Sequence, residues 1–396
     1  MGYSCVTKVY SYICNKHLIV IHMKIVSKSL IFIAFLILMI SCADKKQSAD
    51  EIIQIDVSKI YPEKILFIED MADIEYVQME FHDDYLFSSS PRHVSSSTVM
   101  FRDNSTNDFL FFTGDGKPKS KFNHFGQGPG EYSMLSFYVY DEEEDRLYVL
   151  SNNNLLVYSS TGNLYYSLPL PENARINSVF DFDKESLIIH HQGNVYNTNF
   201  VRISKKDASV VAEINITDTK YIDLAVREGT ASYGMGRTSL LRHKDGFLLT
   251  DFSKDTVFFY GNNNKLNPAL IRTPPIFEMN PYIYLNSFVE TGGYIFLMSV
   301  TVKIENGRFP FTFLMIDKKD HSVYKQKILL KDYEGKVVDL STSTITNNDS
   351  GTGLISLPLF ELKKANEENK LRGKLKEMVE ASNDDSNDIY MILHFK

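Results

Sequence analysis

Hydrophobic and aromatic residues in this chain form short runs that are separated by polar turns. Five of these runs end at a tight polar turn, and another short hydrophobic stretch follows each turn. The first three turns recur at intervals of about 46 residues, and the other two follow at wider intervals. A strand, a turn and a further strand that repeat at such a period predict an array of similar β-sheets. The turns span residues 113–116, 160–163, 205–208, 260–263 and 317–320.

Each turn, with the strand on either side, has the pattern of the hairpin that joins the third and fourth strands of a propeller blade. Outside these five blades lie the strands at 65–79 and a C-terminal region with a hydrophobic segment at 353–357, an amphipathic helix at 359–381 and a strand at 389–395. Because a ring of blades would otherwise end in two open strand edges, we predict that these parts form a sixth blade together. The expected fold is all-β: a six-bladed β-propeller of four-stranded antiparallel blades, closed by N- and C-terminal strands, with one C-terminal amphipathic helix. Seven blades is the alternative count.

The most regular repeat is preceded by the Gly- and Pro-rich sequence GQGPGEY at residues 126–132. A phosphate-binding loop does not fit, because Glu131 stands where the dinucleotide-binding motif has its third glycine and Pro129 has no amide hydrogen to donate. The segment is therefore interpreted as a structural crossing between blades, where glycine permits a positive φ. The crossing consists of Gly126, Gly128, Pro129 and Gly130.

The N-terminal 41 residues have the pattern of an export signal. Met23 is the expected start, because Lys24 and Lys28 then form a basic region ahead of the apolar segment 30–40. Residues 1–22 are interpreted as an upstream misassignment of the start. The apolar segment has about eleven residues, whereas a membrane-spanning helix needs about twenty. A cleaved signal is therefore predicted, and an uncleaved signal anchor is the alternative.

Ser41 and Cys42 resemble the lipobox of bacterial lipoproteins, with Met39 where leucine is commoner. The resemblance implies cleavage before Cys42 and lipidation of its thiol, which would anchor the mature chain to a membrane. We therefore expect a lipid-anchored protein of the cell envelope that faces the periplasm or lies on the outer-membrane surface. Three segments result: 1–41 with the extension and the signal, 42–60 with a tether and an entry strand, and 61–396 with the propeller.

Removal of residues 1–41 changes the charge and the cysteine count. Four lysines and no acidic residue are lost, so the number of basic side chains falls from 42 to 38 against 50 acidic ones. Nucleic-acid binding is excluded, because phosphate recognition needs a basic face. Cys42 is then the only cysteine, which excludes disulfides and thiolate metal sites in the propeller. The 27 Phe and 23 Tyr residues favour strands, and the absence of Trp weakens a polysaccharide-binding interpretation.

The GQGPGEY crossing and the two strands after it resemble a propeller repeat of the NHL type. More closely, the mature chain over residues 42–396 resembles the six-bladed β-propeller lipoproteins of unknown function that occur in anaerobic bacteria. This resemblance implies binding at the cell surface or in the periplasm, and it assigns no reaction. The NHL-type resemblance rests on segments 126–132, 137–139 and 146–150. Beyond the lipobox and the terminal helix and strand, the resemblance to the lipoproteins rests on segments 55–58, 74–77, 126–132 and 254–258.

No cofactor or metal ion is expected. The acidic run at 141–145 offers the oxygen ligands that Ca²⁺ prefers, but its position at a hairpin favours a solvated turn. Residues 103–108 lack the glycine and the glutamate of an EF-hand loop. His190 and His191 are neighbours on one strand, so they point to opposite faces of the sheet and cannot share one metal ion. The HExxH and GxSxG motifs of common hydrolases are absent from the sequence.

The face on which the blades are connected is the expected binding surface, because loops from all blades converge there on a central pocket. Arg237 and Arg242 lie at or near the end of residues 218–238, a glycine-containing segment without strand periodicity that is either a functional insertion or a long crossover. Basic groups there would suit an anionic or polyhydroxylated ligand, and ordinary solvated arginines are the alternative. The candidate ligand-binding residues are Arg92, His93, Glu131, Tyr132, Arg237, Arg242 and His243.

Two functions from different classes fit this sequence. The first is a lipid-anchored module outside the cytoplasm that binds or scaffolds a small molecule, a glycan or a protein, and the lack of a catalytic motif favours it. The second is an enzyme, a glycan lyase or hydrolase, whose catalytic residues would meet in the central pocket. Two carboxyl groups about 5 to 10 Å apart in that pocket would favour the enzyme.

Overall fold

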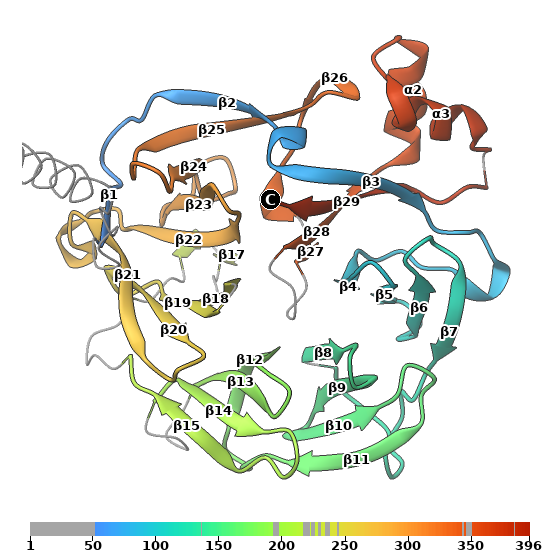
Figure 1. The fold of residues 1–396 in the computed structure, drawn as a ribbon. Helices are drawn as coiled ribbons and strands as arrows, with labels where there is room; N and C mark the ends of the chain where they lie inside the picture. Colours follow the sequence, from blue (N-terminus) through green and yellow to red (C-terminus); the bar gives the residue numbers. More distant parts are fainter. Residues whose placement is uncertain are drawn as a thin grey trace, which may run out of the picture. The chain divides into compact units, whose positions relative to one another are not determined.

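A computed structural model shows the fold (Figure 1), in which Ile52–Lys396 form one compact unit. Cys42, Arg237 and the predicted export signal lie outside the residues that the structure describes. The described residues are 52–135, 137–192, 198–216, 222, 226–228, 231–233, 238–243, 245–342, 344–345, 351–383 and 385–396.

Six antiparallel four-stranded blades stand in a ring (Figure 1), which confirms the predicted fold. In the first five blades the strands follow one another from the axis to the rim, and the chain then crosses to the axis again. The five predicted turns all connect the third strand of a blade to the fourth. The first three blades are β4 (Pro91–Val94), β5 (Thr98–Arg102), β6 (Phe109–Thr113), β7 (Pro118–Phe122); β8 (Phe137–Asp141), β9 (Arg146–Ser151), β10 (Asn154–Tyr158), β11 (Leu164–Pro169); and β12 (Arg175–Asp181), β13 (Ser186–Gln192), β14 (Phe200–Ser204), β15 (Val210–Ile214). The next two are β18 (Thr238–His243), β19 (Gly246–Asp251), β20 (Thr256–Gly261), β21 (Leu266–Thr273); and β22 (Ile283–Glu290), β23 (Tyr294–Thr301), β24 (Phe311–Asp317), β25 (Val323–Leu330).

The sixth blade takes its strands from both ends of the propeller, as predicted. Its order is β27 (Thr344–Ile345), β28 (Thr352–Leu357), β29 (Ile389–Phe395) and β3 (Ala72–Gln78). The antiparallel pairing of β29 with β3 runs over seven residues, from Ile389 opposite Gln78 to Phe395 opposite Ala72. This ladder closes the ring, because it joins the last blade to a strand that precedes the first.

The N-terminal strands extend beyond this closure. β1 (Ile53–Asp56) pairs in parallel with β21 on the fourth blade, and β2 (Glu63–Phe67) pairs in parallel with β25 on the fifth. Only β3 of the strands predicted at 65–79 belongs to the sixth blade, so the assignment of the whole segment to that blade was wrong. The short 3₁₀ helix Ile68–Asp70 lies between β2 and β3, and there the chain passes from one blade to the next. The N-terminal segment thus covers the rim of three successive blades.

The third strands of the blades have continuous hydrophobic runs because both of their faces are buried. On β6, Phe109 and Phe111 pack against the second blade, whereas Leu110 and Phe112 pack in a cluster with Tyr390 of the sixth. Successive side chains of a strand point to opposite faces, and both faces of this blade are covered by neighbours. The core therefore consists of layers between blades, and the packing of these layers sets the positions of the strand ends at the axis.

The helical segment predicted at 359–381 is present and is divided into α2 (Leu359–Glu367) and α3 (Gly373–Ala381). Asn369 and Gly373 have positive φ angles of 57° and 54° at the break. Leu362 and Leu375 bury the inner faces of the helices against the fifth and sixth blades. In the described part of the chain no helix has the length and apolar character needed to cross a membrane.

The segment at 218–238, which shows no strand periodicity in the sequence, contains two short strands in the structure. β16 (Val226–Glu228) and β17 (Ala231–Tyr233) pair there as a short antiparallel hairpin. Strands of three residues are too short to produce a visible period in the sequence. The remaining elements are β26 (Tyr333–Val337) and the 3₁₀ helices Asp83–Tyr85, Ile276–Glu278 and Leu340–Thr342.

Candidate ligand-binding cavity

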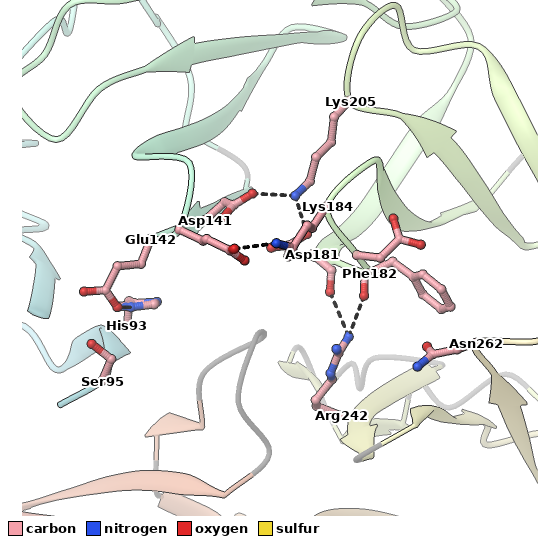
Figure 2. A pocket seen from close by; sticks show the side chains of 12 residues that line it. His93, Ser95, Asp141, Glu142, Asp181, Phe182, Lys184, Lys205, Arg242 and Asn262 are labelled. Atoms are coloured by element: carbon pink, nitrogen blue, oxygen red, sulfur yellow. Dashed lines mark hydrogen bonds and ion pairs between the residues drawn. The ribbon is translucent and has the colours of Figure 1, made fainter. Parts of the chain in front are cut away.

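A cavity of about 680 Å³ lies among the ends of the innermost strands of the first four blades (Figure 2). Ligand sites in proteins commonly have volumes of about 300 to 1,000 Å³, so this cavity has the size of a small-molecule site. The lining residues are His93, Ser95, Asp141, Glu142, Glu143, Asp181, Phe182, Asp183, Lys184, Lys205, Arg242 and Asn262.

The cavity lies on the face opposite to the predicted one. The crossing between the first two blades leads into the start of β8, whereas the cavity is lined by Asp141 at the end of β8 and by the turn that follows. In the same way, Asp181 is the last residue of β12. The cavity is therefore built by the hairpins within blades and not by the connections between blades. The sequence did not predict this cavity, because charged residues in these hairpins were interpreted as solvated, although the ring brings the strand ends together.

Lys205 links the second and third blades through two buried carboxylates. Its Nζ lies 2.6 Å from Oδ2 of Asp141 and 2.7 Å from Oδ1 of Asp181 (Figure 2). The three side chains are only 3% to 7% exposed, so water screens their charges poorly. Lys205 directly follows β14, while the two aspartates end β8 and β12. One buried cation thus holds the ends of two neighbouring innermost strands together.

The carboxylate of Asp181 has fewer hydrogen-bond donors than the carboxylate of Asp141. Asp141 accepts hydrogen bonds from Nζ of Lys205 and from the backbone N–H of Glu144. Apart from the close contact with the same Nζ, the described residues give the Asp181 carboxylate no hydrogen bond. Burial raises the pKa of Asp181 to about 6, against the opposing effects of Lys205 and Arg242. Asp181 is therefore a buried carboxylate in the cavity wall whose single donor among the described side chains is Lys205.

Glu142 is held by the first blade. Nε2 of His93, on β4, lies 3.2 Å from Oε2 of Glu142, and Oγ of Ser97 donates to Oε1. The imidazole of His93 packs edge-on against Tyr140, with the ring centroids 5.1 Å apart. Burial acts to raise the pKa of Glu142, but the hydrogen bonds to His93 and to the nearby hydroxyl groups hold this pKa well below its usual range. The wall therefore carries a fixed negative charge at neutral pH.

Two arginines contact the part of the cavity wall that the third blade supplies. Nη1 of Arg242, on β18, donates to the main-chain oxygens of Asp181 and Phe182 at 3.3 and 2.9 Å (Figure 2). The guanidinium of Arg202 lies 3.9 Å from the ring centroid of Phe182, and its Nη2 lies 2.6 Å from Oδ2 of Asp183. Phe182 is only 2% exposed. Its ring is therefore used for packing and offers no open face to a ligand.

An exposed ion pair connects the second and third blades at the cavity. Nζ of Lys184 lies 2.5 Å from Oε1 of Glu143, and the two side chains are 72% and 64% exposed. Water screens a pair this exposed, so it adds little to stability. The pair can open without disturbing the fold.

A related cluster joins the fourth and fifth blades. Oε1 of Glu290 lies 3.2 Å from Nε2 of His243 and 2.8 Å from Nζ of Lys318. Glu290 ends β22 as Asp181 ends β12, and Lys318 directly follows β24 as Lys205 follows β14. Burial acts to raise the pKa of Glu290, but His243 and Lys318 lower it below the usual value. The same device thus recurs in two blades, although this second cluster does not line the cavity.

Of the seven predicted binding residues, His93 and Arg242 line the cavity. Arg92 precedes His93 on β4 but is exposed, and His243 contacts Glu290 in the second cluster. The structure therefore brings together two of these residues from different blades and leaves Arg92 and His243 outside the lining.

Glu131 and Tyr132 belong to the crossing and not to the cavity lining. Oε2 of Glu131 accepts a hydrogen bond from the backbone N–H of Gly128 at 2.7 Å. Gly130 has a φ of 74°, in the region that favours glycine. Tyr132 is fully buried, and its hydroxyl accepts a hydrogen bond from the backbone N–H of His124 at 3.0 Å. These contacts shape the backbone between the first two blades.

Sequence reasoning missed Asp181 and Lys205, and it interpreted Asp141 as part of a solvated turn. A signal for all three is present in the sequence. Asp141 and Asp181 each follow an aromatic residue at the end of an innermost strand, and Lys205 and Lys318 each begin a Lys-Lys-Asp turn. An alignment of the blades with one another would have placed these residues on one face.

The acidic run, the loop at 103–108 and the two adjacent histidines were the sequence features considered for metal binding. In the structure, Asp141, Glu142 and Glu143 are engaged with basic partners. Burial and the neighbouring His191 lower the pKa of His190 to about 4, which keeps this imidazole neutral. Among the described residues, no group of three or more His, Cys, Asp or Glu side chains is arranged to hold a metal ion.

Known proteins include a family whose profile this sequence matches and a solved structure with a similar fold. The sequence profile of a family described as "Domain of unknown function (DUF4934)" matches residues 52–394. A protein of Bacteroides fragilis NCTC 9343 that is described as exported is 15% identical, with a TM-score of 0.59 over 87% of this chain and 100% of that one. A member of the duf4221 family from Bacteroides vulgatus ATCC 8482 is 11% identical, with a TM-score of 0.48 over 82% of this chain and 98% of that one. No curated protein matches the sequence.

Proposed function

This chain belongs to the family described as a domain of unknown function, DUF4934, and we propose on that premise that it is a binding protein that acts outside the cytoplasm. A small polar ligand occupies the cavity at the ends of β4, β8, β12 and β18. The similar protein of Bacteroides fragilis is described as exported, which agrees with the signal predicted ahead of Cys42. A lipid on Cys42 holds the propeller at the cell envelope.

The observation that carries the proposal is a cavity whose charged side chains are held in place by contacts within the protein. Lys205 lies between Asp141 and Asp181, and His93 and Ser97 hold Glu142. Breaking a buried pair leaves an uncompensated charge, so these side chains keep their positions when the cavity fills. Fixed polar groups reduce the entropy cost of binding.

The same geometry favours binding over a glycan lyase or hydrolase. Asp141 and Asp181 are neighbouring carboxylates, but both contact the Nζ of Lys205. This cation occupies the space between them, which a glycosidic bond or a water molecule would need in an acid–base pair. The buried ring of Phe182 also offers no stacking face to a sugar.

Retention of small molecules by the purified protein tests the proposal. The protein is dialysed against the low-molecular-mass fraction of growth medium, and mass spectrometry identifies what it retains. Asn262→Trp fills the cavity from an exposed turn, and Lys319→Trp, in the corresponding turn of the fifth blade, is the control. At least one compound should be retained by the unchanged protein and the control and lost by Asn262→Trp. Retention of nothing, or equal retention by all three proteins, would contradict the proposal.

A further inference from the structure

Carboxylates outnumber basic groups in the cavity wall, which holds five Asp and Glu side chains and three Lys and Arg side chains. Glu143 pairs with Lys184, and Asp183 pairs with Arg202 from behind the wall. These two carboxylates are therefore compensated. The negative charge that remains comes from Asp141, Asp181 and Glu142.

One cation serves two of these three carboxylates. Lys205 contacts both Asp141 and Asp181, so the trio keeps one negative charge when both carboxylates are ionised. Glu142 is held by Ser97 and by His93, which adds a positive charge only when it is protonated. Arg242 offsets this charge in part from the neighbouring blade. The cavity thus favours a ligand that brings positive charge.

Asp181 gives a second and independent indication of the ligand. Its side chain is more than nine-tenths buried, yet the described residues supply it only with the contact to Lys205. A carboxylate can accept about four hydrogen bonds, and Lys205 is the single donor that the described side chains supply to Asp181. A ligand with hydrogen-bond donors would complete this group.

We infer that the cavity takes a small ligand with a primary ammonium group, which donates hydrogen bonds to Asp181 and lies in the field of Glu142. The inference rests on the proposed function and names the chemical class of the ligand that the same cavity binds. An ammonium group combines three donors with a positive charge. A neutral sugar supplies donors without the positive charge, and an anion brings a charge of the wrong sign.

Four five-carbon compounds that differ only in their end groups test the class. Cadaverine carries two amines, δ-aminovalerate an amine and a carboxylate, pentamethylene glycol two hydroxyls, and glutarate two carboxylates. Calorimetric titration of the purified protein should show both amines binding at least about tenfold more tightly than the glycol and glutarate. Equal or tighter binding of the glycol or of glutarate, or no binding of cadaverine at millimolar concentration, would overturn the inference.

Variants that remove one negative charge test which carboxylates bind the ammonium group. Asp181→Asn keeps the side-chain volume, and it should weaken cadaverine binding by about tenfold or more, the effect of losing one close charge partner. Glu142→Gln lies outside the Lys205 trio and should weaken binding by several-fold even if Asp181→Asn unfolds. Glu144→Gln, an exposed carboxylate of the same turn that pairs with Arg146, is the matched control. Unchanged affinity in Glu142→Gln and in a folded Asp181→Asn would contradict the assignment.

The pH dependence of cadaverine binding gives a readout that a purely structural role would not change. Burial raises the pKa of Asp181 to about 6, so the carboxylate that binds the ammonium becomes protonated below that pH. Affinity should then fall by up to about tenfold per pH unit, and Asp181→Asn should abolish this slope. An identical profile in both proteins would overturn the assignment. The charged and titratable groups around Asp181 are Lys205, Asp141, Arg242, Glu142, Glu143, Asp183, Lys184 and His93.

The outcomes separate this inference from the proposed function. If the compound retained from growth medium is lost in Asn262→Trp but carries no amine, the cavity binds a ligand and the ammonium assignment falls. If no compound is retained and no amine binds, both fall.

Discussion

Lys205 is the single residue that most directly ties the cavity to the stability of the ring. Its ammonium group is buried between the ends of β8 and β12. A buried charge that loses its partner stays desolvated without compensation. The residue therefore has a structural role that can be measured without knowledge of the ligand.

Replacing Lys205 by methionine should lower the free energy of unfolding by about 3–5 kcal/mol, because Asp141 and Asp181 lose their shared cation. Urea denaturation at neutral pH measures the change. Lys206→Met, at the exposed next position, should stay within about 0.5 kcal/mol of the unchanged protein. A loss no larger than in this control would mean that other groups compensate the two carboxylates.

Glu142 should make stability depend on pH in the acid range. Burial acts to raise its pKa, but hydrogen bonds lower it below the usual value of 4.5. A carboxyl group with a lower pKa in the folded state stabilises the fold above its unfolded pKa, and this contribution is lost as the pH falls. The stability difference between the unchanged protein and Glu142→Gln should therefore be largest at neutral pH and shrink below about pH 4.5. Urea denaturation at several pH values checks this, and a difference that stays constant would refute it.

At the scale of elements, the ring depends on strands from both ends of the propeller. β29 lies between β28 and β3, and in the described part of the blade it is the strand that joins them. β1 and β2 add parallel strands to the rims of the fourth and fifth blades. Closure and rim covering are thus separate contributions of the N-terminal segment.

Deleting Ile389–Lys396 should abolish the cooperative unfolding transition, because the sixth blade loses the strand that joins its two parts. Thermal unfolding followed by circular dichroism measures this. Deleting Ile52–Val57 removes only the rim strand β1, so this control should melt cooperatively at a lower temperature than the full chain. A chain without β29 that melts like the full chain would refute the role of this ladder in closure.

The elements differ in how far the sequence could predict them. Third strands and their turns were predicted, because FLFF at 109–112 and the turn residues after it are local patterns. The parallel pairing of β2 with β25 was not predicted, because the alternating exposure of the β2 side chains fits any sheet edge. Which edge it reaches depends on how the 3₁₀ helix directs the chain across the rim.

At the scale of the whole molecule, the remaining expectation is the membrane anchor at Cys42. Cys42→Ala should move the protein from the membrane fraction to the soluble fraction of cells, because acyl chains supply the membrane affinity. Immunoblots of fractionated cells measure this, and Ser48→Ala, in the predicted tether after Cys42, is the control that should stay in the membrane fraction. Membrane retention of Cys42→Ala would contradict lipid anchoring.

The sequence by itself determined the repeated strands, the turns within blades and the use of both termini to close the ring. These follow from alternation, from turn residues and from the need to cover strand edges, which are properties of short segments and of their order. The cavity was decided only by the tertiary structure. Asp141 and Asp181 end two different strands and Lys205 directly follows a third. In the sequence, a charged residue at each of these positions is typical of a solvated hairpin. They become a buried trio because packing between blades brings their strand ends together, where water can no longer solvate them.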